Sequence, residues 1–473
     1  MGTSLVWLRD DLRLADNPAL HEAIQHGGTV CVLYVFDQSP DIRPLGAATR
    51  WWLHHSLEAL RTQIEDVGGQ LILRNGIAAD VVKDLIAEIG ADALLWNRRY
   101  GLPERTTDTA LKNWAHEHDV EAHSFQANLL FEPWQVQTKQ GENYKVFTPF
   151  WRACLEQPQP RQPLPAPSSL TPATLRDSAT HPSSDALDDW GLLPSTPDWA
   201  GGLRDEWTPG EAGAHNRLTT FFDERVEDYS QGREKPGQEA TSRLSPHLRF
   251  GEISPFQIWQ AAKENKTTGL EHEIRVFGSE VGWREFCWQL LYHNPDLATQ
   301  NYRREYDAFE WEQDTADDVS AWQQGHTGYP MVDAGMRQLW NTGWMHNRIR
   351  MVTASFLIKN LMVNWRTGEQ WFWDTLVDAD AASNPANWQW VAGSGADAAP
   401  YFRIFNPVTQ SKKFDPSGGY LRRFVPELAA LDDSSVHEPW KNPEVAPDYP
   451  EPIVDLKETR HRALDAYARV KDH

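Results

Sequence analysis

Two stretches of this chain carry the most information about its fold and function: Thr241-Ser-Arg-Leu-Ser-Pro-His-Leu-Arg-Phe-Gly-Glu-Ile-Ser-Pro255 and Asp378-Ala-Asp-Ala-Ala-Ser-Asn-Pro-Ala-Asn-Trp-Gln-Trp390. Around Arg243, the first stretch offers a threonine hydroxyl, two serine hydroxyls and main-chain donors, a set that suits charge-assisted hydrogen bonds to an extended pyrophosphate. Ser245 followed by Pro246 also fits a helix start, with serine as the N-cap and proline in the first turn. Alone, the first stretch supports a phosphate site and an ordinary helix start equally well.

The length and charge of the chain limit the number of domains and the classes of function that it can have. A chain of 473 residues is too long for one hydrophobic core, so we expect two or three domains. The net charge of −22 argues against a general nucleic-acid binder, because proteins that neutralise phosphates carry a basic footprint. The charge is uneven, however: residues 171–230 hold 12 acidic against 4 basic side chains, whereas residues 341–370 hold 4 basic against 1 acidic. A local basic rim on an acidic body is therefore compatible with the composition.

Composition also bears on location and metals. The N-terminus enters an apolar strand pattern directly, and no stretch is long and apolar enough to span a bilayer, so we expect a soluble, cytoplasmic protein with no membrane partner. Cys31, Cys154 and Cys287 are far apart and show no CxxC spacing, which indicates neither a disulfide framework nor a cysteine metal site. The histidine pairs at 21 and 26 and at 116 and 118 lack the spacing that places two ligands on one helix face, so we expect no metal.

Short apolar runs alternate with helical patterns in the first part of the chain. The runs lie at 3–10, 29–36, 70–75 and 93–98, and the helical patterns lie at 18–26, 47–67, 77–90 and 104–119. Strands separated by helices of this length predict an α/β domain with a doubly wound parallel sheet. Asp16-Asn17-Pro18 is typical of a helix start, with a polar cap before proline.

The rest of the chain is predicted to be mostly helical. Prolines crowd residues 156–200, which indicates an extended connector with little helix. From 214 onward helical periodicity dominates, as at 331–340, 345–363 and 366–376. We therefore expect an α/β domain at 1–130, an interdomain connector at 131–200 and an all-α domain at 201–473.

Both opening stretches closely resemble flavin-binding signatures of the photolyase/cryptochrome family. Further matches lie at Gly282-Trp-Arg-Glu-Phe286, Gly328-Tyr-Pro-Met-Val-Asp-Ala334 and Gly343-Trp-Met-His-Asn-Arg-Ile-Arg-Met351, and the resemblance runs from Leu5 to Trp440. It is closest to class I-like cyclobutane pyrimidine dimer (CPD) photolyases. It implies an N-terminal α/β domain that binds an antenna chromophore and an all-α C-terminal domain that binds flavin adenine dinucleotide (FAD).

The resemblance also implies which residues would contact FAD: Tyr229, Thr241, Ser242, Arg243, Leu244, Ser245, Phe277, Arg284, Asn347, Arg350, Asp378, Asp380 and Asn384. Asn384 would face flavin N5, where a neutral amide can hydrogen-bond and favour reduced flavin. Plant cryptochromes resemble this segment but carry Asp at that position. Phe277 departs from related bacterial enzymes, which often have Trp there.

A cavity for a pyrimidine dimer flipped out of DNA is implied too, walled by Glu280, Trp283, Asn347, Met351 and Trp390. Indole faces and a polarizable thioether would pack on the weakly polar dimer. Glu280 would hydrogen-bond a pyrimidine edge or stabilise charge on the dimer, with burial raising its pKa. Asn347 stands where (6-4) photolyases have histidine, which argues against that substrate. Arg233, Arg348 and Gln410 match positions that contact DNA phosphates.

Three tryptophans and one glutamate complete the implied site. Trp311, Trp365 and Trp388 match residues that relay electrons from the surface to oxidised flavin, with Trp388 nearest the flavin and Trp311 nearest solvent. Three ordinary core indoles are the simpler alternative. Glu104 matches a carboxylate that binds methenyltetrahydrofolate, but Pro103 replaces the Asn found beside it. Folate, a deazaflavin, another flavin and no antenna therefore all stay open.

The sequence thus predicts a monomeric, light-driven lyase that repairs CPDs in UV-damaged DNA. Excited reduced FAD would give an electron to the dimer, the cyclobutane ring would split and the electron would return. Glu280, Asn384 and the three relay tryptophans would be the catalytic residues. The alternative is a cryptochrome-type blue-light photoreceptor without repair activity, which an altered cavity and a signalling tail would distinguish. A general flavin oxidoreductase is disfavoured, because no nicotinamide site is recognisable.

Overall fold

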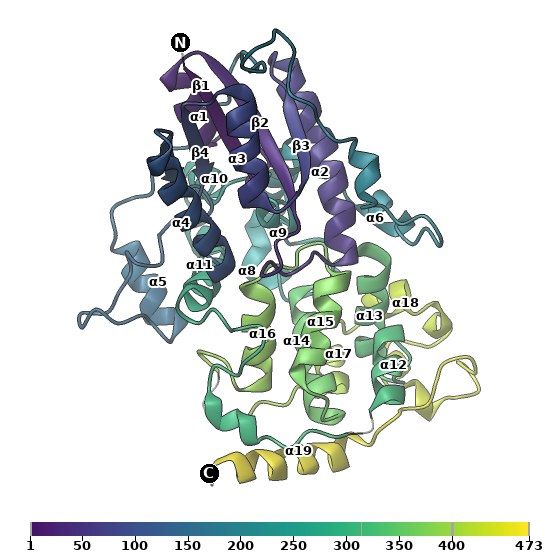
Figure 1. Ribbon diagram of the computed structural model, residues 1–473. Helices are drawn as coiled ribbons and strands as arrows, with labels where there is room; N and C mark the ends of the chain where they lie inside the picture. The colour runs from purple at the N-terminus through teal and green to yellow at the C-terminus, as the bar shows by residue number, and fades with distance from the viewer. Residues whose placement is uncertain (1, 314, 399–401, 472–473) are drawn as a thin grey trace.

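The chain forms an α/β part at its N-terminal end and a helical part at its C-terminal end (Figure 1). The computed structural model describes residues 2–313, 315–398 and 402–471. The sheet contains β1 (Thr3–Leu8), β2 (Thr29–Asp37), β3 (Leu71–Gly76), β4 (Ala93–Asn97) and β5 (Glu121–Phe125), in the order β3-β2-β1-β4-β5. Every pairing between neighbouring strands is parallel. The predicted parallel, doubly wound sheet is confirmed.

Helices cover both faces of this sheet: α1 (Pro18–His26), α2 (Ala47–Asp66), α3 (Ala78–Ile89) and α4 (Leu102–Glu117). Successive side chains of a strand point to opposite faces. In β1, Val6 and Leu8 pack with α1 and α2, whereas Leu5 and Trp7 pack with α3 and α4. From Leu5 to Leu8 the strand is apolar at every position because both of its faces are buried. The predicted start of α1 is present, since the Asn17 side chain accepts a hydrogen bond from the Leu20 N–H at 3.2 Å.

The sequence patterns did not predict β5, whose residues are Glu-Ala-His-Ser-Phe. The strand lies at the edge of the sheet, where Glu121 and His123 are exposed and form an ion pair at 2.6 Å. An edge strand carries charged side chains without cost, so its sequence lacks the apolar run that identifies the buried strands.

The proline-rich segment 156–200 contains, within the described part of the chain, a single 3₁₀ turn as its helical element, η1 (Leu187–Trp190). It runs along the α/β part, where Trp190 stacks on Phe36 with ring centroids 5.4 Å apart. Upstream of it, α5 (Phe147–Leu155) packs into the helical part. A Cβ on Gly282 would lie 2.6 Å from the Trp151 ring, so glycine is what allows α5 to approach so closely.

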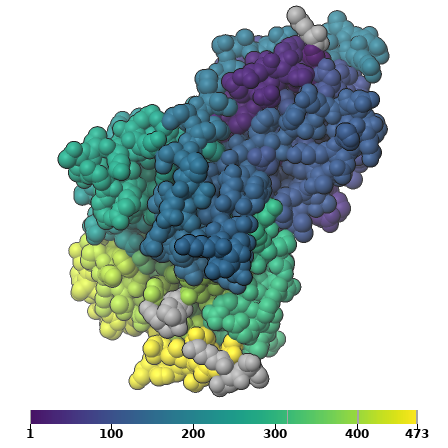
Figure 2. Space-filling view, turned by 90° about the vertical axis from the view of Figure 1, so that its left-hand side faces the viewer, coloured from purple at the N-terminus to yellow at the C-terminus, as the bar shows by residue number. Residues whose placement is uncertain are grey.

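The helical part is built from many short helices around two large apolar clusters and a smaller one beside α19 (Leu456–Lys471), and none of the described helices is both long and apolar enough to cross a bilayer. The predicted helical patterns correspond to α13, to α14 continued by the π-helical turn η4, and to α15. Figure 2 shows the blue segment around residues 100–155 lying over the boundary between the two parts. The elements are α6 (Gly201–Glu206), α7 (Glu211–Glu224), η2 (Val226–Asp228), α8 (Tyr229–Gly232), α9 (Ser245–Arg249), α10 (Pro255–Glu264), α11 (Glu271–His293), η3 (Arg304–Ala308), α12 (Ala316–Gln324), α13 (Pro330–Thr342), α14 (Asn347–Ser355), η4 (Phe356–Asn360), α15 (Trp365–Thr375), α16 (Ser383–Ala392), α17 (Pro407–Phe414), α18 (Gly419–Phe424), η5 (Pro426–Leu428), η6 (Ser435–His437), η7 (Pro439–Lys441) and α19 (Leu456–Lys471).

Buried polar contacts fix the two parts against each other. The loop after β1 docks beside α9: Arg13 Nη1 donates to the Gly251 carbonyl at 2.9 Å, and the Glu211 carboxylate accepts from the Leu14 N–H at 2.8 Å. Gly251 has a φ of +64°, and a Cβ there would lie 2.0 Å from the Asp10 carbonyl oxygen. Only glycine permits both this backbone conformation and this approach. The docking holds α9, and the cavity it borders, in a fixed position relative to the sheet.

Candidate functional site

A cavity of about 610 Å³ opens in the helical part. Its walls come from α8, α9, α11, α14 and α16 and from the segment 376–380. Most residues predicted to bind cofactor or substrate line it: Tyr229, Arg233, Ser242, Leu244, Ser245, Phe277, Glu280, Trp283, Arg284, Asn347, Arg348, Arg350, Met351, Asp378, Asp380, Asn384, Trp388 and Trp390. Residues distant in sequence therefore converge on one site.

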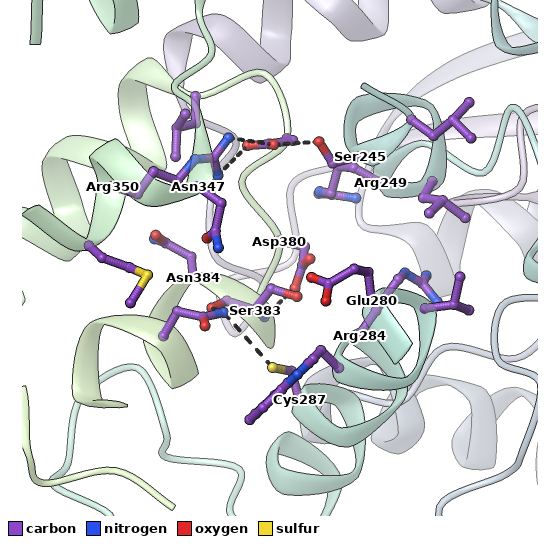
Figure 3. A pocket seen from close by; sticks show the side chains of 18 of the residues that line it. Ser245, Arg249, Glu280, Arg284, Cys287, Asn347, Arg350, Asp380, Ser383 and Asn384 are labelled. Atoms are coloured by element: carbon purple, nitrogen blue, oxygen red, sulfur yellow. Dashed lines mark hydrogen bonds and ion pairs between the residues drawn. The ribbon is translucent and has the colours of Figure 1, made fainter. Parts of the chain in front are cut away.

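A hydrogen bond from Ser245 to Asp378 joins the two opening sequence stretches at this cavity, and Asp378 also pairs with Arg350 (Figure 3). Arg350 donates from Nη1 and Nη2 to the two Asp378 carboxylate oxygens at 3.1 and 2.7 Å, and the Ser245 hydroxyl donates to Asp378 Oδ2 at 2.7 Å. Ser245 is therefore not the N-cap of α9: Leu244 holds that position, without a side-chain cap. The predicted helix start is confirmed, because α9 begins at Ser245 with Pro246 in its first turn, but the N-cap role of Ser245 was wrong: its hydroxyl is used in a long-range contact that local sequence does not reveal.

The turn before α9 orients its side chains in two directions. Arg243 has a φ of +52°, and Ser242, Leu244 and Ser245 on either side of it line the cavity. The Arg243 side chain leaves the cavity, pairs with Glu206 and stacks on the Trp344 ring at 4.8 Å. A strained backbone of this kind persists only where surrounding contacts impose it.

Besides Arg243, three residues predicted to bind cofactor or DNA lie away from the lining. Thr241 precedes the strained turn and is not among the lining residues. Glu104 lies in the first turn of α4, in the α/β part. Gln410 lies on α17, the helix whose Phe414 ring contacts the Arg348 guanidinium at 4.4 Å.

The segment that follows Asp378 begins α16 and presents Asn384. Asp380 Oδ1 accepts hydrogen bonds from the N–H groups of Ala382 and Ser383 at 2.8 and 2.5 Å, which satisfies main-chain donors at the start of the helix. Asn384, one residue into α16, donates from Nδ2 to Glu369 Oε1 at 2.8 Å. Asn347 and Asn384 thus face the cavity from one side (Figure 3).

Helix α11 forms the opposite wall (Figure 3). Trp283 stacks on Phe147 of α5 with ring centroids 3.9 Å apart and planes 11° apart, so its position is fixed by the connector. Arg284 Nη1 donates to the Asn128 carbonyl at 2.7 Å. Phe277 packs against Phe221 with centroids 4.5 Å apart.

Acidic and basic groups alternate in the cavity wall next to α8. Arg233 pairs with Glu280 at 2.7 Å, and Arg348 pairs with Glu234. Burial raises the pKa of the Glu280 carboxyl, and Arg233 only partly opposes this effect. Met351 lies beside the second pair, with its sulfur 3.9 Å from Arg348 Nη1.

Polar groups without protein partners point to a polar ligand. Among the described residues, the Tyr229 hydroxyl, the Ser242 hydroxyl and the Asn347 amide line the cavity and make no hydrogen bond. Hydroxyl and amide groups of this kind suit the ribityl and phosphate oxygens of a dinucleotide. Next to them, burial and the neighbouring arginines lower the pKa of His346 to about 3, so His346 is neutral; its Nδ1 accepts from the Arg348 N–H and caps α14. The lining therefore fits FAD.

The three predicted relay tryptophans belong to one apolar cluster but differ in exposure. Trp388 lines the cavity, Trp365 is completely buried and Trp311 is partly exposed. Trp388 contacts Phe372 and Trp322, with ring centroids 4.9 and 6.3 Å apart. This order of exposure is the order that a relay from solvent to the cavity requires.

Sequence reasoning missed several lining or supporting residues. Arg249 lies inside the first opening stretch and pairs with Asp10 at 2.9 Å while donating to the Ala379 carbonyl at 2.8 Å. The arginine-rich character of that stretch was the available signal. Glu369 supports Asn384 from α15, and nothing near it in the sequence indicates that role.

Two family profiles match the chain. The profile described as "DNA photolyase" matches residues 4–168, and the one described as "FAD binding domain of DNA photolyase" matches residues 277–469. The second match confirms FAD as the cofactor and covers α11 to α19, which contribute most of the cavity wall.

Full-length relatives agree with these profiles. A deoxyribodipyrimidine photo-lyase from Agrobacterium fabrum is 50% identical, covering 99% of this chain and 98% of that protein. Cryptochrome-2 from Arabidopsis thaliana is 34% identical, covering 99% of this chain and 79% of that protein. A crystal structure described as a bacterial class III photolyase from Agrobacterium tumefaciens superposes with a TM-score of 0.95 at 50% identity, covering 100% of this chain and 98% of that one.

The class III description corrects the expectation of a class I-like enzyme. The motifs that suggested class I surround the cavity, where a shared cofactor constrains the residues, so they do not resolve the class. The match over the whole chain, together with both profiles, establishes that this protein belongs to the DNA photolyase/cryptochrome family.

Proposed function

We propose that the cavity performs light-dependent repair of cyclobutane pyrimidine dimers in DNA, as a photolyase of the class III type. The main support for this function is that one cavity has two kinds of lining. One part presents polar groups without protein partners, which suit FAD, and the other presents aromatic and thioether groups, which suit a flipped pyrimidine dimer. Bound FAD supplies an electron that light drives onto the dimer and that returns once the ring has split, so no net oxidation or reduction occurs.

On the cofactor side, the chain provides a preorganised frame. Arg350, Asp378 and Ser245 form a connected set whose geometry is already satisfied within the protein. Because these contacts are already made, the three residues would hold the neighbouring cavity wall in place and would not need to rearrange when the cofactor binds. Ser242, Asn347 and Tyr229 then supply hydrogen bonds that the protein leaves unmade.

On the substrate side, Trp283, Met351 and Trp390 provide broad apolar contact for the dimer. Glu280 has a raised pKa, and a protonated carboxyl can donate a hydrogen bond to a pyrimidine carbonyl. Arg233 would hold the DNA backbone while the dimer leaves the stack.

Arg348 extends the phosphate-binding edge, and Gln410 is proposed to reach it from α17. Because Glu280 and Glu234 neutralise the two arginines in the free protein, phosphates must compete with these carboxylates. Each phosphate contact that replaces a carboxylate contact would release counterions from the DNA, so binding should weaken as the salt concentration rises.

Several parts of the proposal concern residues and properties outside the cavity. We propose that Trp311, Trp365 and Trp388 relay electrons to oxidised FAD. Glu104 marks the region for an antenna pigment, either methenyltetrahydrofolate or a deazaflavin, which an absorption spectrum of released pigment would identify. We also propose a monomer located in the cytoplasm, and light scattering of the purified protein tests its monomeric state.

A blue-light photoreceptor without repair is the second candidate, favoured by the 34% identity to cryptochrome-2. Asn384 favours repair, because the neutral amide takes the place of the Asp of plant cryptochromes, and Asn347 favours CPDs over (6-4) products.

The deciding experiment uses the purified protein with its flavin chemically reduced, mixed with a DNA oligomer that carries one CPD. Illumination should restore the undamaged oligomer, and a dark sample should not. Trp283→Ala should lose most of this activity with its flavin retained. Absence of light-dependent repair in a protein that holds reduced FAD would overturn repair in favour of the photoreceptor.

A further inference from the structure

A chain of contacts runs from the α/β part to Asn384. Arg43 lies in the loop between β2 and α2, which Figure 1 shows descending to the helical part. It donates from Nη1 to Glu369 Oε1 at 2.7 Å and from Nη2 to Glu369 Oε2 at 2.9 Å. Glu369 in turn accepts two hydrogen bonds from Asn384 Nδ2, at its main-chain oxygen at 3.0 Å and at Oε1 at 2.8 Å. One carboxylate thus joins a guanidinium of one part to a cavity-lining amide of the other.

These contacts determine which end of the Asn384 amide faces the cavity. Both partners of Nδ2 are oxygen acceptors, so a reversed amide would place Oδ1 against two oxygens with no hydrogen between them. Oδ1 must therefore point away from Glu369. Within the described residues, no group donates to Asn384 Oδ1, and Asn384 lines the cavity. The amide thus presents a hydrogen-bond acceptor to the ligand.

The fixed position of the Glu369 side chain is what enforces this orientation, together with the Glu369 main-chain oxygen. Glu369 is 1% exposed, and a buried carboxylate is strongly unfavourable without a cation. Arg43 supplies that cation through two parallel hydrogen bonds. The loop is anchored beside it, since the Arg43 guanidinium stacks on the Trp373 ring at 3.9 Å and Trp373 Nε1 donates to the Pro44 carbonyl at 2.8 Å.

We propose that Arg43 is a positioning residue for the flavin: through Glu369 it holds the Asn384 amide with its oxygen toward the cavity. The proposal rests on the proposed function, because it takes the ligand to be FAD with its N5 near Asn384. An acceptor there stabilises flavin that carries a proton on N5, which is the reduced cofactor. Without Arg43, the Glu369 carboxylate would lose the two donors that hold its Oε1 toward Asn384 Nδ2. The amide could then turn and present its NH₂ group, which favours oxidised flavin instead.

The test compares Arg43→Met with a matched control, Arg74→Met, in the FAD-loaded full chain. Arg74 pairs with Glu88 at 3.0 Å within the α/β part and does not line the cavity. The measurements are the rate at which chemically reduced flavin reoxidises in air, followed by absorbance, and the flavin midpoint potential. Flavin content and melting temperature report folding. Arg43→Met should reoxidise about tenfold faster with a lower potential, as expected for loss of one hydrogen bond, and Arg74→Met should match the wild type.

A second variant keeps the proposal testable if Arg43→Met folds poorly. Glu369→Gln can donate or accept, so it frees the amide to turn although Arg43 is present. It should also reoxidise about tenfold faster, and the double variant should be no faster than either single one, because both act through one amide. Wild-type reoxidation rates in either folded, flavin-loaded single variant would overturn the proposal. A wild-type protein that binds no FAD would instead overturn the proposed function.

Discussion

Glu285 offers a test of how the connector is joined to the substrate wall. It lies on α11 and is 2% exposed. Its Oε2 accepts a hydrogen bond from the Phe131 N–H at 3.1 Å, whereas Oε1 is buried without a hydrogen-bond partner among the described residues and lies 3.8 Å from Arg284 Nη1. Burial raises the pKa of this carboxyl to about 7, with Arg284 only partly opposing the shift. Folding therefore favours the protonated acid, and ionisation weakens the fold.

The pKa difference sets the size and sign of the effect. In the unfolded chain the carboxyl loses its proton near its ordinary pKa of 4.5, but in the folded protein it keeps the proton up to about 7. Between these values the unfolded chain binds fewer protons, so stability falls as pH rises and then levels off. At 1.36 kcal/mol per pKa unit, the cost is about 2 kcal/mol at pH 6 and about 3 kcal/mol at pH 8.5.

Glu285→Gln removes this cost while keeping an oxygen acceptor for the Phe131 N–H. Urea unfolding followed by tryptophan fluorescence at pH 6.0 and 8.5 measures both proteins. The stability of the variant relative to the wild type should grow by about 1 kcal/mol over this range. The comparison at two pH values cancels any pH-independent effect of the new side chain. A constant difference would refute a raised Glu285 pKa.

The remaining predictions concern repair. Glu280→Ala should weaken dimer binding and repair yield roughly 10-fold or more, since a hydrogen bond to a charged group contributes about 1.5–3 kcal/mol; flavin content should be unchanged, and unchanged affinity and yield would remove Glu280 from the site. Affinity for damaged DNA should fall steeply with salt despite the acidic total, because Arg233 and Arg348 displace phosphate counterions; a flat salt titration would contradict the basic rim. Trp311→Phe should repair normally when its flavin is reduced chemically beforehand but photoreduce much more slowly from the oxidised state; photoreduction at the wild-type rate would mean that Trp311 is not the exit of the relay.

Local pattern was sufficient for most of the secondary structure. Strands β1 to β4 each contain a continuous apolar run because both faces of the sheet are covered, and Asn17-Pro18 specifies a helix start through contacts within one turn. The family motifs likewise identified the flavin cavity, because the residues around a bound cofactor are constrained in type and spacing. Those signals lie within a few residues of the structure they specify.

Contacts between distant segments were decided by the tertiary structure alone. The sequence could not show that the Ser245 hydroxyl donates to Asp378 instead of capping its own helix. Nor could it show that the Arg243 side chain points away from the cavity toward Glu206. The link from Arg43 to Glu369 spans 326 positions and exists only because the α/β part docks on α15. Side-chain hydroxyls and guanidinium groups have several possible partners of similar energy, and packing of the two parts selects among them. The sequence by itself thus determined most of the elements and the cofactor, whereas docking determined the partners of polar side chains that contact distant segments.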